Sequence, residues 1–392
     1  MRIVHVINDL RGGGAQNLVF SLASSQCKHK HDVQIIAIHQ QTTDYERNME
    51  VKLFNSFVKV HNLGYKPNHG YIGWIRSAIR LFALFKELKP DIINSHLEMS
   101  HSITALAFLF LPQSSRRVAT VHNAPETWGR TPFIKFLTRP LFWSFLNYST
   151  PRIYCSDAAR AYENNWKGQY ITIPNGVSPP SIPMQLQEKR AAFRREMGIP
   201  NNAFIVVSVG TAREEKNHIT AIRAIAVLHN MLPQPVHYVI CGARGTGSAA
   251  LDDVIKETGL SKYVHLLGLR QDSREILFYS DCYLSASLRE GLPLAVLEAL
   301  FSGLPCVLSA IKPHCDLALG IPDCFIVENN PIPLAESIRH VVLNGCNSSA
   351  MRSQREPLLH NSTIEVCASR YLHFYESLLF DIPRSSRNFS KS

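Results

Sequence analysis

Short apolar runs alternate with segments of helical periodicity along most of this chain. Apolar residues recur every three or four positions most clearly at residues 73–90, where basic residues stand between them and the spacing predicts a helix. Strands that alternate with helices favour a parallel sheet covered on both faces, because parallel strands need a crossover connection. In the first half, strands are predicted at residues 2–8, 32–39, 91–96, 117–123 and 152–156.

The alternation is interrupted once and then restarts. Residues 173–183, IPNGVSPPSIP, are rich in Pro, Ser, Gly and Asn, which is typical of a linker. Beyond them the pattern again predicts strands separated by helices, followed by one long final helix. Strands are predicted there at residues 203–210, 236–242, 264–268, 281–287, 305–310 and 325–330.

The pattern therefore predicts an α/β protein with two doubly wound domains, and the length of 392 residues suits two cores better than one. The predicted parts are a first domain at residues 1–178, a second domain at 179–362, a helix at 363–380 and a polar tail at 381–392.

Net charge is concentrated in the first half. Residues 1–178 hold 20 Lys and Arg against 11 Asp and Glu, whereas residues 179–392 hold 21 against 20. This excess indicates an anionic partner such as an acidic lipid, a phosphorylated substrate or nucleic acid, or else a solvated basic surface. Only charge suggests nucleic acid and no recognised motif supports it, so we expect none.

The chain shows no targeting or membrane-spanning signal. Its first residues, MRIVHVIND, predict a strand, and the longest apolar run, residues 103–112, is shorter than the roughly 20 residues of a spanning helix. Nine scattered cysteines without a CxxC pair are typical of reduced thiols. We expect a cytoplasmic protein, with a position at the inner face of the cytoplasmic membrane left open.

Two glutamates eight positions apart, Glu290 and Glu298, frame the start of an apolar helix. Gly291 gives the backbone freedom, and Pro293 suits a first helical turn, whose free N–H groups favour phosphate. A buried carboxylate is costly without partners, and a ribose diol would satisfy Glu298. The alternative is an acidic cap and an unrelated surface glutamate.

A loop of the second half carries two cations, Arg213 and Lys216, directly after a predicted strand. Two cations at a strand end suit a diphosphate. The alternative is ion pairing with the neighbouring Glu214 and Glu215.

Two loops of the first half are further candidates. Residues 9–16, DLRGGGAQ, follow the first strand, and glycines such as Gly13 and Gly14 let the backbone approach an anion at a helix N-terminus. His122 ends another strand, where an imidazole can bind a substrate hydroxyl. The alternatives are a tight turn and a locally capped histidine. Together the four loops describe a site for a nucleotide sugar.

In order and spacing these motifs resemble the retaining glycosyltransferases of family four. EGLPLAVLE at residues 290–298 resembles the family's E-x7-E motif, and SVGTAREEKN, IPNGV, TVHN and GGGAQ accompany it. The resemblance covers about residues 1–345. It implies the GT-B fold, with two Rossmann-like domains facing across a cleft and a C-terminal helix that crosses back to the first domain.

The resemblance also implies roles for single residues. Glu298 would hold the ribose hydroxyls, Glu290 would contact hydroxyls of the donor sugar, and His122 would lie near the transferred sugar. The catalytic candidates are His122, Glu290, Arg213 and Lys216. The donor-binding candidates are Gly13, Gly14, Arg213, Lys216, Glu290, Gly291, Leu292, Pro293, Leu294 and Glu298.

The chain departs from the family pattern at two positions. Thr211 stands where the family often has arginine, which leaves open whether Arg213 replaces it, and Gln16 stands where glutamate is common.

The functional hypothesis is a retaining hexosyltransferase. It would move a sugar from a nucleoside diphosphate sugar, with UDP favoured over GDP, to a hydroxyl of a glycan or lipid-linked glycan in lipopolysaccharide, capsule or exopolysaccharide biosynthesis. No Asp-x-Asp motif occurs in a suitable place, so neither a metal nor another cofactor is expected. The alternatives are a nucleotide-sugar 2-epimerase of the same architecture and a non-catalytic sugar-nucleotide-binding partner.

Two stretches, residues 73–86 and 132–148, combine basic residues with Trp, Phe and Leu. They leave two interpretations open: peripheral contact of the basic first domain with an anionic membrane, or core helices with basic outer faces.

Overall fold

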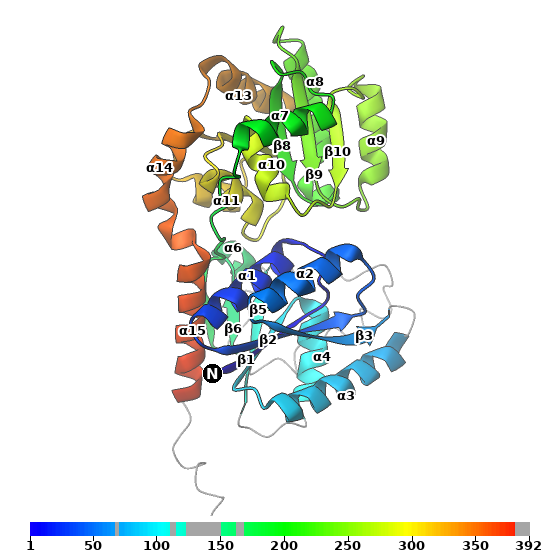
Figure 1. Cartoon of the computed structure of the whole chain (residues 1–392), viewed down its shortest axis with the longest axis vertical. Helices are drawn as coiled ribbons and strands as arrows, with labels where there is room; N and C mark the ends of the chain where they lie inside the picture. The colour runs from blue at the N-terminus through cyan, green and yellow to red at the C-terminus, as the bar shows by residue number, and fades with distance from the viewer. Residues whose placement is uncertain (67–69, 110–114, 123–149, 162–167, 381–392) are drawn as a thin grey trace, which may run out of the picture. The chain divides into compact units, whose positions relative to one another are not determined.

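The computed structural model describes residues 1–66, 70–109, 115–122, 150–161 and 168–380. The chain divides into two compact units (Figure 1). The first unit comprises Met1–Gly176 and the chain again from Ile364, and the second comprises Val177–Thr363. Both are α/β, as the pattern predicts, whereas the tail predicted at 381–392 lies outside the described residues.

The first unit contains a sheet of seven parallel strands. They are β1 (Arg2–Ile7), β2 (Asp32–His39), β3 (Lys59–Tyr65), β4 (Ile92–His96), β5 (Arg116–Val121), β6 (Arg152–Tyr154) and β7 (Tyr170–Thr172). Their order in the sheet is β3-β2-β1-β4-β5-β6-β7. The direction of strand addition therefore reverses between β1 and β4, and ligands of such sheets bind beyond the carboxyl ends at that point.

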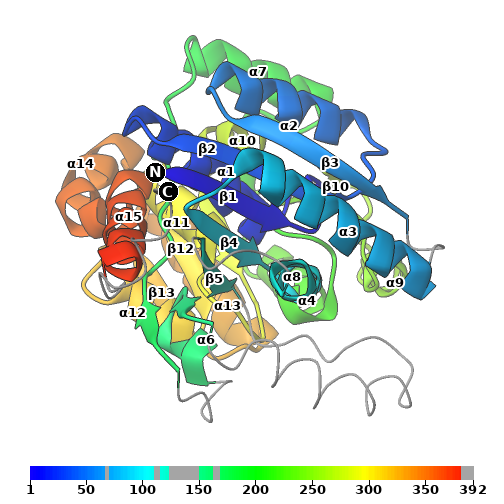
Figure 2. The same ribbon diagram turned by 90° about the horizontal axis from the view of Figure 1, so that it is seen from below.

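Helices cover both faces of this sheet. They are α1 (Gly14–Lys28), α2 (Asp44–Asn55), α3 (Gly70–Leu88), α4 (Glu98–Phe108), α6 (Asp157–Ala161) and α15 (Ile364–Phe380). α3 lies beside α4 (Figure 2), and their apolar residues, including Leu81 and Ile103, form one core with Val4 and Val6 of β1. Because side chains alternate along a strand, His5 faces the other side, where α1 packs against α15.

The second unit contains a sheet of six parallel strands. They are β8 (Phe204–Val209), β9 (Val236–Cys241), β10 (Val264–Gly268), β11 (Cys282–Ser285), β12 (Cys306–Ser309) and β13 (Cys324–Val327). Their order is β10-β9-β8-β11-β12-β13, so the reversal falls between β8 and β11. The candidate loops of this unit follow these two strands.

The helices of the second unit pack against both faces of the sheet. They are α7 (Leu186–Glu196), α8 (His218–His229), α9 (Ser248–Glu257), α10 (Ser273–Tyr279), α11 (Leu294–Phe301), α12 (Lys312–Ala318), α13 (Pro331–Asn344) and α14 (Ser348–Leu359). Apolar residues of α8 and α13 fill the core with those of β8, β9 and β11.

The structure corrects the sequence-based expectation at three places. The edge strands β3 and β7 were not predicted, because both are partly exposed and neither shows a buried apolar run. Pro293 was expected in the first turn of its helix, but it is the N-terminal cap, and α11 begins at Leu294.

Candidate active site

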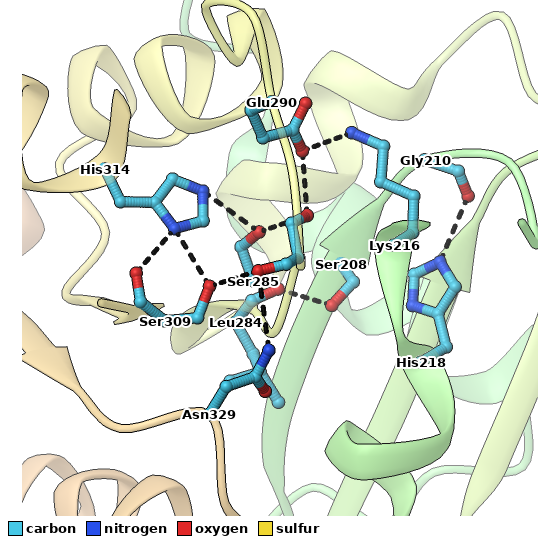
Figure 3. Close-up of polar contacts among 11 residues, drawn as sticks. Ser208, Gly210, Lys216, His218, Leu284, Ser285, Glu290, Ser309, His314 and Asn329 are labelled. Carbon is cyan, nitrogen blue, oxygen red and sulfur yellow. Dashed lines mark hydrogen bonds and ion pairs between the residues drawn. The ribbon is translucent and has the colours of Figure 1, made fainter. Parts of the chain in front are cut away.

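The loops after β8 and β11 bring Lys216 and Glu290 together (Figure 3). Lys216 ends a short 3-10 helix (Glu214–Lys216), and its Nζ lies 2.6 Å from Oε1 of Glu290. Only 11% of the Glu290 side chain is exposed, so this ion pair is largely shielded from water. The alternative in which Lys216 pairs with its neighbours Glu214 and Glu215 is therefore wrong.

A polar chain fixes the Glu290 carboxylate from below. Ser287 Oγ donates to the same Oε1 at 2.7 Å, and Ser285 Oγ lies 3.1 Å from Ser287 Oγ. The buried His314 lies 3.4 Å from Ser285 through Nε2, and its Nδ1 donates to the Ser309 carbonyl at 2.9 Å. Oε1 of Glu290 thus has two donors, while Oε2 has no partner among the described residues and points away from Lys216 (Figure 3). Oε2 is available as an acceptor for a ligand hydroxyl.

Two glycines let the loops of this site approach one another. A Cβ at Gly210 would lie 3.1 Å from Cε of Lys216, so the lysine side chain crosses directly over this position. A Cβ at Gly242, in the loop after β9, would lie only 1.9 Å from the carbonyl oxygen of Gly210. Gly242 therefore admits the backbone that carries Lys216, a role which sequence reasoning missed.

Glu298 lies buried on α11 and has a partner that the sequence did not reveal. Arg274 of α10 places Nε 2.8 Å and Nη2 2.7 Å from Oε1 of Glu298. Burial nevertheless raises the pKa of the Glu298 carboxyl, against the opposing effect of Arg274. Both contacts fall on Oε1, and Oε2 has no partner among the described residues, which leaves an acceptor for a hydroxyl. The sequence did hold a signal that Arg274 lies near the ligand-binding edge of the sheet, because it stands in the first turn of a helix that follows a strand.

The N-terminus of α11 has no side-chain cap. Its cap, Pro293, has an extended backbone and provides no side-chain hydrogen bond, and the first turn holds no acidic residue. Of the other candidates in this turn, Gly291 and Leu294 are buried and Leu292 is half-buried. Uncapped N–H groups and the positive end of the helix dipole favour phosphate here.

Arg213 is the other cationic candidate of this unit. It precedes the 3-10 helix and is exposed. The arginine that lies near Glu215 is Arg289, whose Nη2 is 3.5 Å from Oε1 of that glutamate. Contact of Arg213 with phosphate stays a prediction.

The glycine loop of the first unit also ends in an uncapped helix. Gly13 caps α1 without a side-chain hydrogen bond, and a Cβ added at Gly14 would have no neighbour within 4 Å among the described residues. Gln16 donates through Nε2 to Oδ1 of Asp9 at 3.0 Å. A glutamate at position 16 would oppose the Asp9 carboxylate, which gives the departure from the family pattern a physical reason.

His122 lies directly after β5 with 5% of its surface exposed. Burial lowers its pKa to about 4, so the imidazole is neutral near pH 7. Nε2 lies 3.0 Å from Nδ1 of His96, whereas Nδ1 has no hydrogen-bond partner in the described part of the chain. This unpaired nitrogen is a polar atom that a ligand could satisfy.

Neither unit shows a metal site in its described residues, where no group of three His, Cys, Asp or Glu side chains is placed to hold an ion. Of the described helices, none is both long enough and apolar enough to cross a membrane.

Two family models divide the chain between them. The model for glycosyl transferases group 1 matches residues 189–356, and the model for Glycosyltransferase Family 4 matches residues 12–179. With two parallel-sheet units and the acidic motif at residues 290–298, they define a glycosyltransferase. The chain belongs to the family-four glycosyltransferases.

Named relatives agree with this assignment. An Escherichia coli UDP-Gal:alpha-D-GlcNAc-diphosphoundecaprenol alpha-1,3-galactosyltransferase is 29% identical over 269 residues, which cover 66% of this chain and 67% of that protein. A Campylobacter jejuni alpha-1,4-N-acetyl-D-galactosaminyltransferase that acts on an undecaprenol-linked glycan is 24% identical over 77% of each chain. These relatives do not favour the 2-epimerase or the non-catalytic partner.

Solved structures confirm the fold. The Anabaena protein HepE, in complex with UDP-glucose, superposes with a TM-score of 0.77 at 17% identity and covers 96% of this chain and 100% of its own. The described architecture is thus the GT-B fold.

Proposed function

We propose that this glycosyltransferase moves a hexosyl group from a nucleoside diphosphate sugar, UDP-linked in preference to GDP-linked, to a hydroxyl of a lipid-linked glycan, with retention of anomeric configuration. The reaction would serve bacterial cell-surface polysaccharide assembly. The observation that carries the proposal is the pair of carboxylates, the partly buried Glu290 and the buried Glu298, each held through Oε1 with Oε2 unpartnered among the described residues. The names of the Escherichia coli and Campylobacter relatives support a lipid-linked acceptor.

The donor would use these groups in turn. Oε2 of Glu298 accepts from the ribose hydroxyls, and Oε2 of Glu290 accepts from a sugar hydroxyl. Lys216, Arg213, the N-terminus of α11 and the glycine loop at Gly13 and Gly14 stabilise the diphosphate charge, which grows as the glycosidic bond breaks. Lys216 can turn from Glu290 toward phosphate because 29% of its side chain is exposed.

The reaction needs no metal in this proposal, because Lys216 and the helix N-terminus supply the positive charge at the diphosphate. We nominate no carboxylate as a nucleophile. The acceptor hydroxyl instead attacks on the face that the phosphate leaves, and the departing phosphate takes its proton.

The first experiment measures melting temperature against UDP, GDP, ADP, CMP and their common sugars, since a ligand that binds only the folded state raises it. We expect UDP to raise the melting temperature of the wild type and of Glu257→Ala, which breaks an exposed pair with Arg223, but not of Glu298→Ala. If no nucleotide shifts the wild type, the proposed donor site is wrong.

We further propose that the first unit contacts an anionic membrane at the cytoplasmic side. Its α3 exposes Ile72, Ile75 and Ile79 on one stripe with Arg76, a pattern that suits an interfacial helix. The other stretch, residues 132–148, lies outside the described residues. Sedimentation with phosphatidylglycerol vesicles should fall when the three isoleucines are changed to serine; binding equal to wild type would exclude α3.

A further inference from the structure

A row of three histidines crosses the sheet of the first unit. His5 lies on β1 beside Asn94 of β4, and His96 of β4 lies beside Thr120 of β5. Each next histidine of the row is therefore two residues closer to the carboxyl edge, and His122 continues the step beyond β5. Because residues two apart on a strand share a face, all three imidazoles lie on the same side of the sheet.

Hydrogen bonds join the row from end to end. Gln26 of α1 places Oε1 2.8 Å from Nε2 of His5, and His5 Nδ1 lies 2.9 Å from His96 Nε2. His96 Nδ1 lies 3.0 Å from Nε2 of His122. His5 and His96 are fully buried, so water does not compete for these contacts.

The hydrogen bonds of the row give all three rings the same tautomer. Burial lowers the pKa of His5 and His122 to about 4 and that of His96 well below its usual value, so the rings are neutral near pH 7. A neutral imidazole has one N–H donor and one acceptor nitrogen. In the orientation that the structure gives the Gln26 amide, its Oε1 faces Nε2 of His5 and only accepts, which assigns the proton of His5 to Nε2. The same then holds for His96 and for His122.

We propose that Gln26, His5 and His96 are positioning residues that hold His122 as the Nε2–H tautomer, so that its Nδ1 accepts a hydrogen bond from a hydroxyl of the transferred sugar. The inference rests on the proposed function. Nδ1 is buried without a partner in the described residues, a condition that proteins seldom leave uncorrected. A sugar hydroxyl can donate to this nitrogen, whereas an ionised phosphate oxygen cannot. The row thereby directs His122 to the sugar and not to the diphosphate.

The tautomer can be read directly in the free protein. Long-range ¹⁵N–¹H correlation spectra of histidine-labelled protein at pH 7.5 distinguish the two neutral tautomers, and the signals lost in His122→Gln assign the ring. We expect Nε2 of His122 to be protonated and Nδ1 to be bare. A proton on Nδ1, as a reversed Gln26 amide would give, overturns the proposal.

Breaking the row tests the positioning role. His96→Leu removes the acceptor for His122 Nε2–H, while His96→Asn keeps one, because its Oδ1 can take the place of Nδ1. Two ligands are compared. One is UDP. The other is the nucleotide sugar that wild type binds most tightly among UDP-glucose, UDP-galactose and their N-acetylamino counterparts. His96→Leu should weaken that UDP-sugar about tenfold and UDP less than twofold, and His96→Asn should restore most of the loss.

A matched control is His265→Leu, which breaks a similar contact of 2.9 Å with His237 in the second unit and should change neither affinity. Equal weakening of UDP and UDP-sugar by His96→Leu, or no rescue by asparagine, contradicts the positioning role. Failure of wild type to bind any nucleotide would instead contradict the proposed function, and the tautomer spectrum would still decide the state of His122.

Discussion

At the scale of single residues, the two motif glutamates are held by different means. Glu290 is bound to a lysine and a serine from its own sheet edge, whereas Glu298 is bound to Arg274, which is partly exposed. For Glu298, burial outweighs this partner, and its pKa is raised. A carboxylate that is kept ionised at such a position weakens the fold and suits a ligand.

Glu298→Gln should separate stability from binding. Because the pKa of Glu298 is raised in the folded protein, its favourable contribution is complete below the unfolded pKa and is lost as pH rises through the folded value. Glutamine imitates the protonated form, so the free energy of unfolding at pH 7 should stay equal or rise. Affinity for UDP should fall about 10–100-fold, the worth of a charged hydrogen bond. Urea unfolding measures the stability and calorimetry measures the affinity for UDP. A less stable variant with unchanged affinity would refute the proposed role of Glu298.

At the scale of elements, the site depends on loops that follow adjacent strands. The loops after β8 and β9 touch through backbone, since Gly242 has the carbonyl of Gly210 where a side chain would begin. Lys216 then crosses over Gly210 to reach Glu290. The positions of the strands therefore determine the distance between Lys216 and Glu290.

Gly242→Ala should destabilise the second unit by about 3 kcal/mol, because its Cβ meets backbone that cannot turn aside. Gly210→Ala should cost less, since its Cβ meets only the flexible Lys216 side chain at 3.1 Å or more, but should weaken nucleotide binding. Gly14→Ala, with open space around it, is the control. Denaturant unfolding ranks the three variants, and equal stability of Gly242→Ala and Gly14→Ala would contradict the account.

The sheet interiors could be predicted from sequence because β8 and β9 are buried along most of their length and are therefore mostly apolar, with one polar residue each, Ser208 and His237. The edge strands β3 and β7 lack that signal. Glu290, Glu298 and Lys216 were found through loops that follow strands. The pairing of Arg274 with Glu298, and the contacts of His314 and Gln26, could not be predicted, because each contact joins distant positions whose approach only the folded chain determines.

At the scale of the whole molecule, buried histidines in both units make the stability of the protein depend on pH. Both units contain histidines whose pKa burial lowers, namely His5, His96, His101, His122, His218, His237 and His314. Each resists protonation in the fold but accepts a proton once the chain unfolds.

Stability should therefore fall as the pH is lowered. Each histidine with a folded pKa of about 4, such as His5, His122 or His218, should lower the free energy of unfolding by about 1 kcal/mol between pH 7 and pH 5.5. The reason is that the unfolded chain binds the proton near pH 6.5, whereas the folded chain does not. Carboxyls with ordinary pKa values remain mostly ionised over this range, whereas Glu298, whose pKa is raised, changes stability in the opposite direction. Urea unfolding of Glu298→Gln at intermediate pH values therefore isolates the histidines. A free energy of unfolding that is constant or rising toward pH 5.5 would show that these rings titrate normally.

The return of the chain to its first unit affects how the protein is made. α15 completes that unit, since Tyr375 accepts from Asn94 at 2.7 Å and the Leu378 carbonyl accepts from Arg116 at 3.1 Å. The second unit is one continuous stretch, Val177–Thr363. During synthesis at about 5–20 residues per second, the later unit can close while the earlier sheet waits roughly 10–40 seconds for its last helix. The first part to leave the ribosome is the last to finish folding, and a nascent chain that stops before Ile364 leaves that sheet exposed to chaperones and proteases.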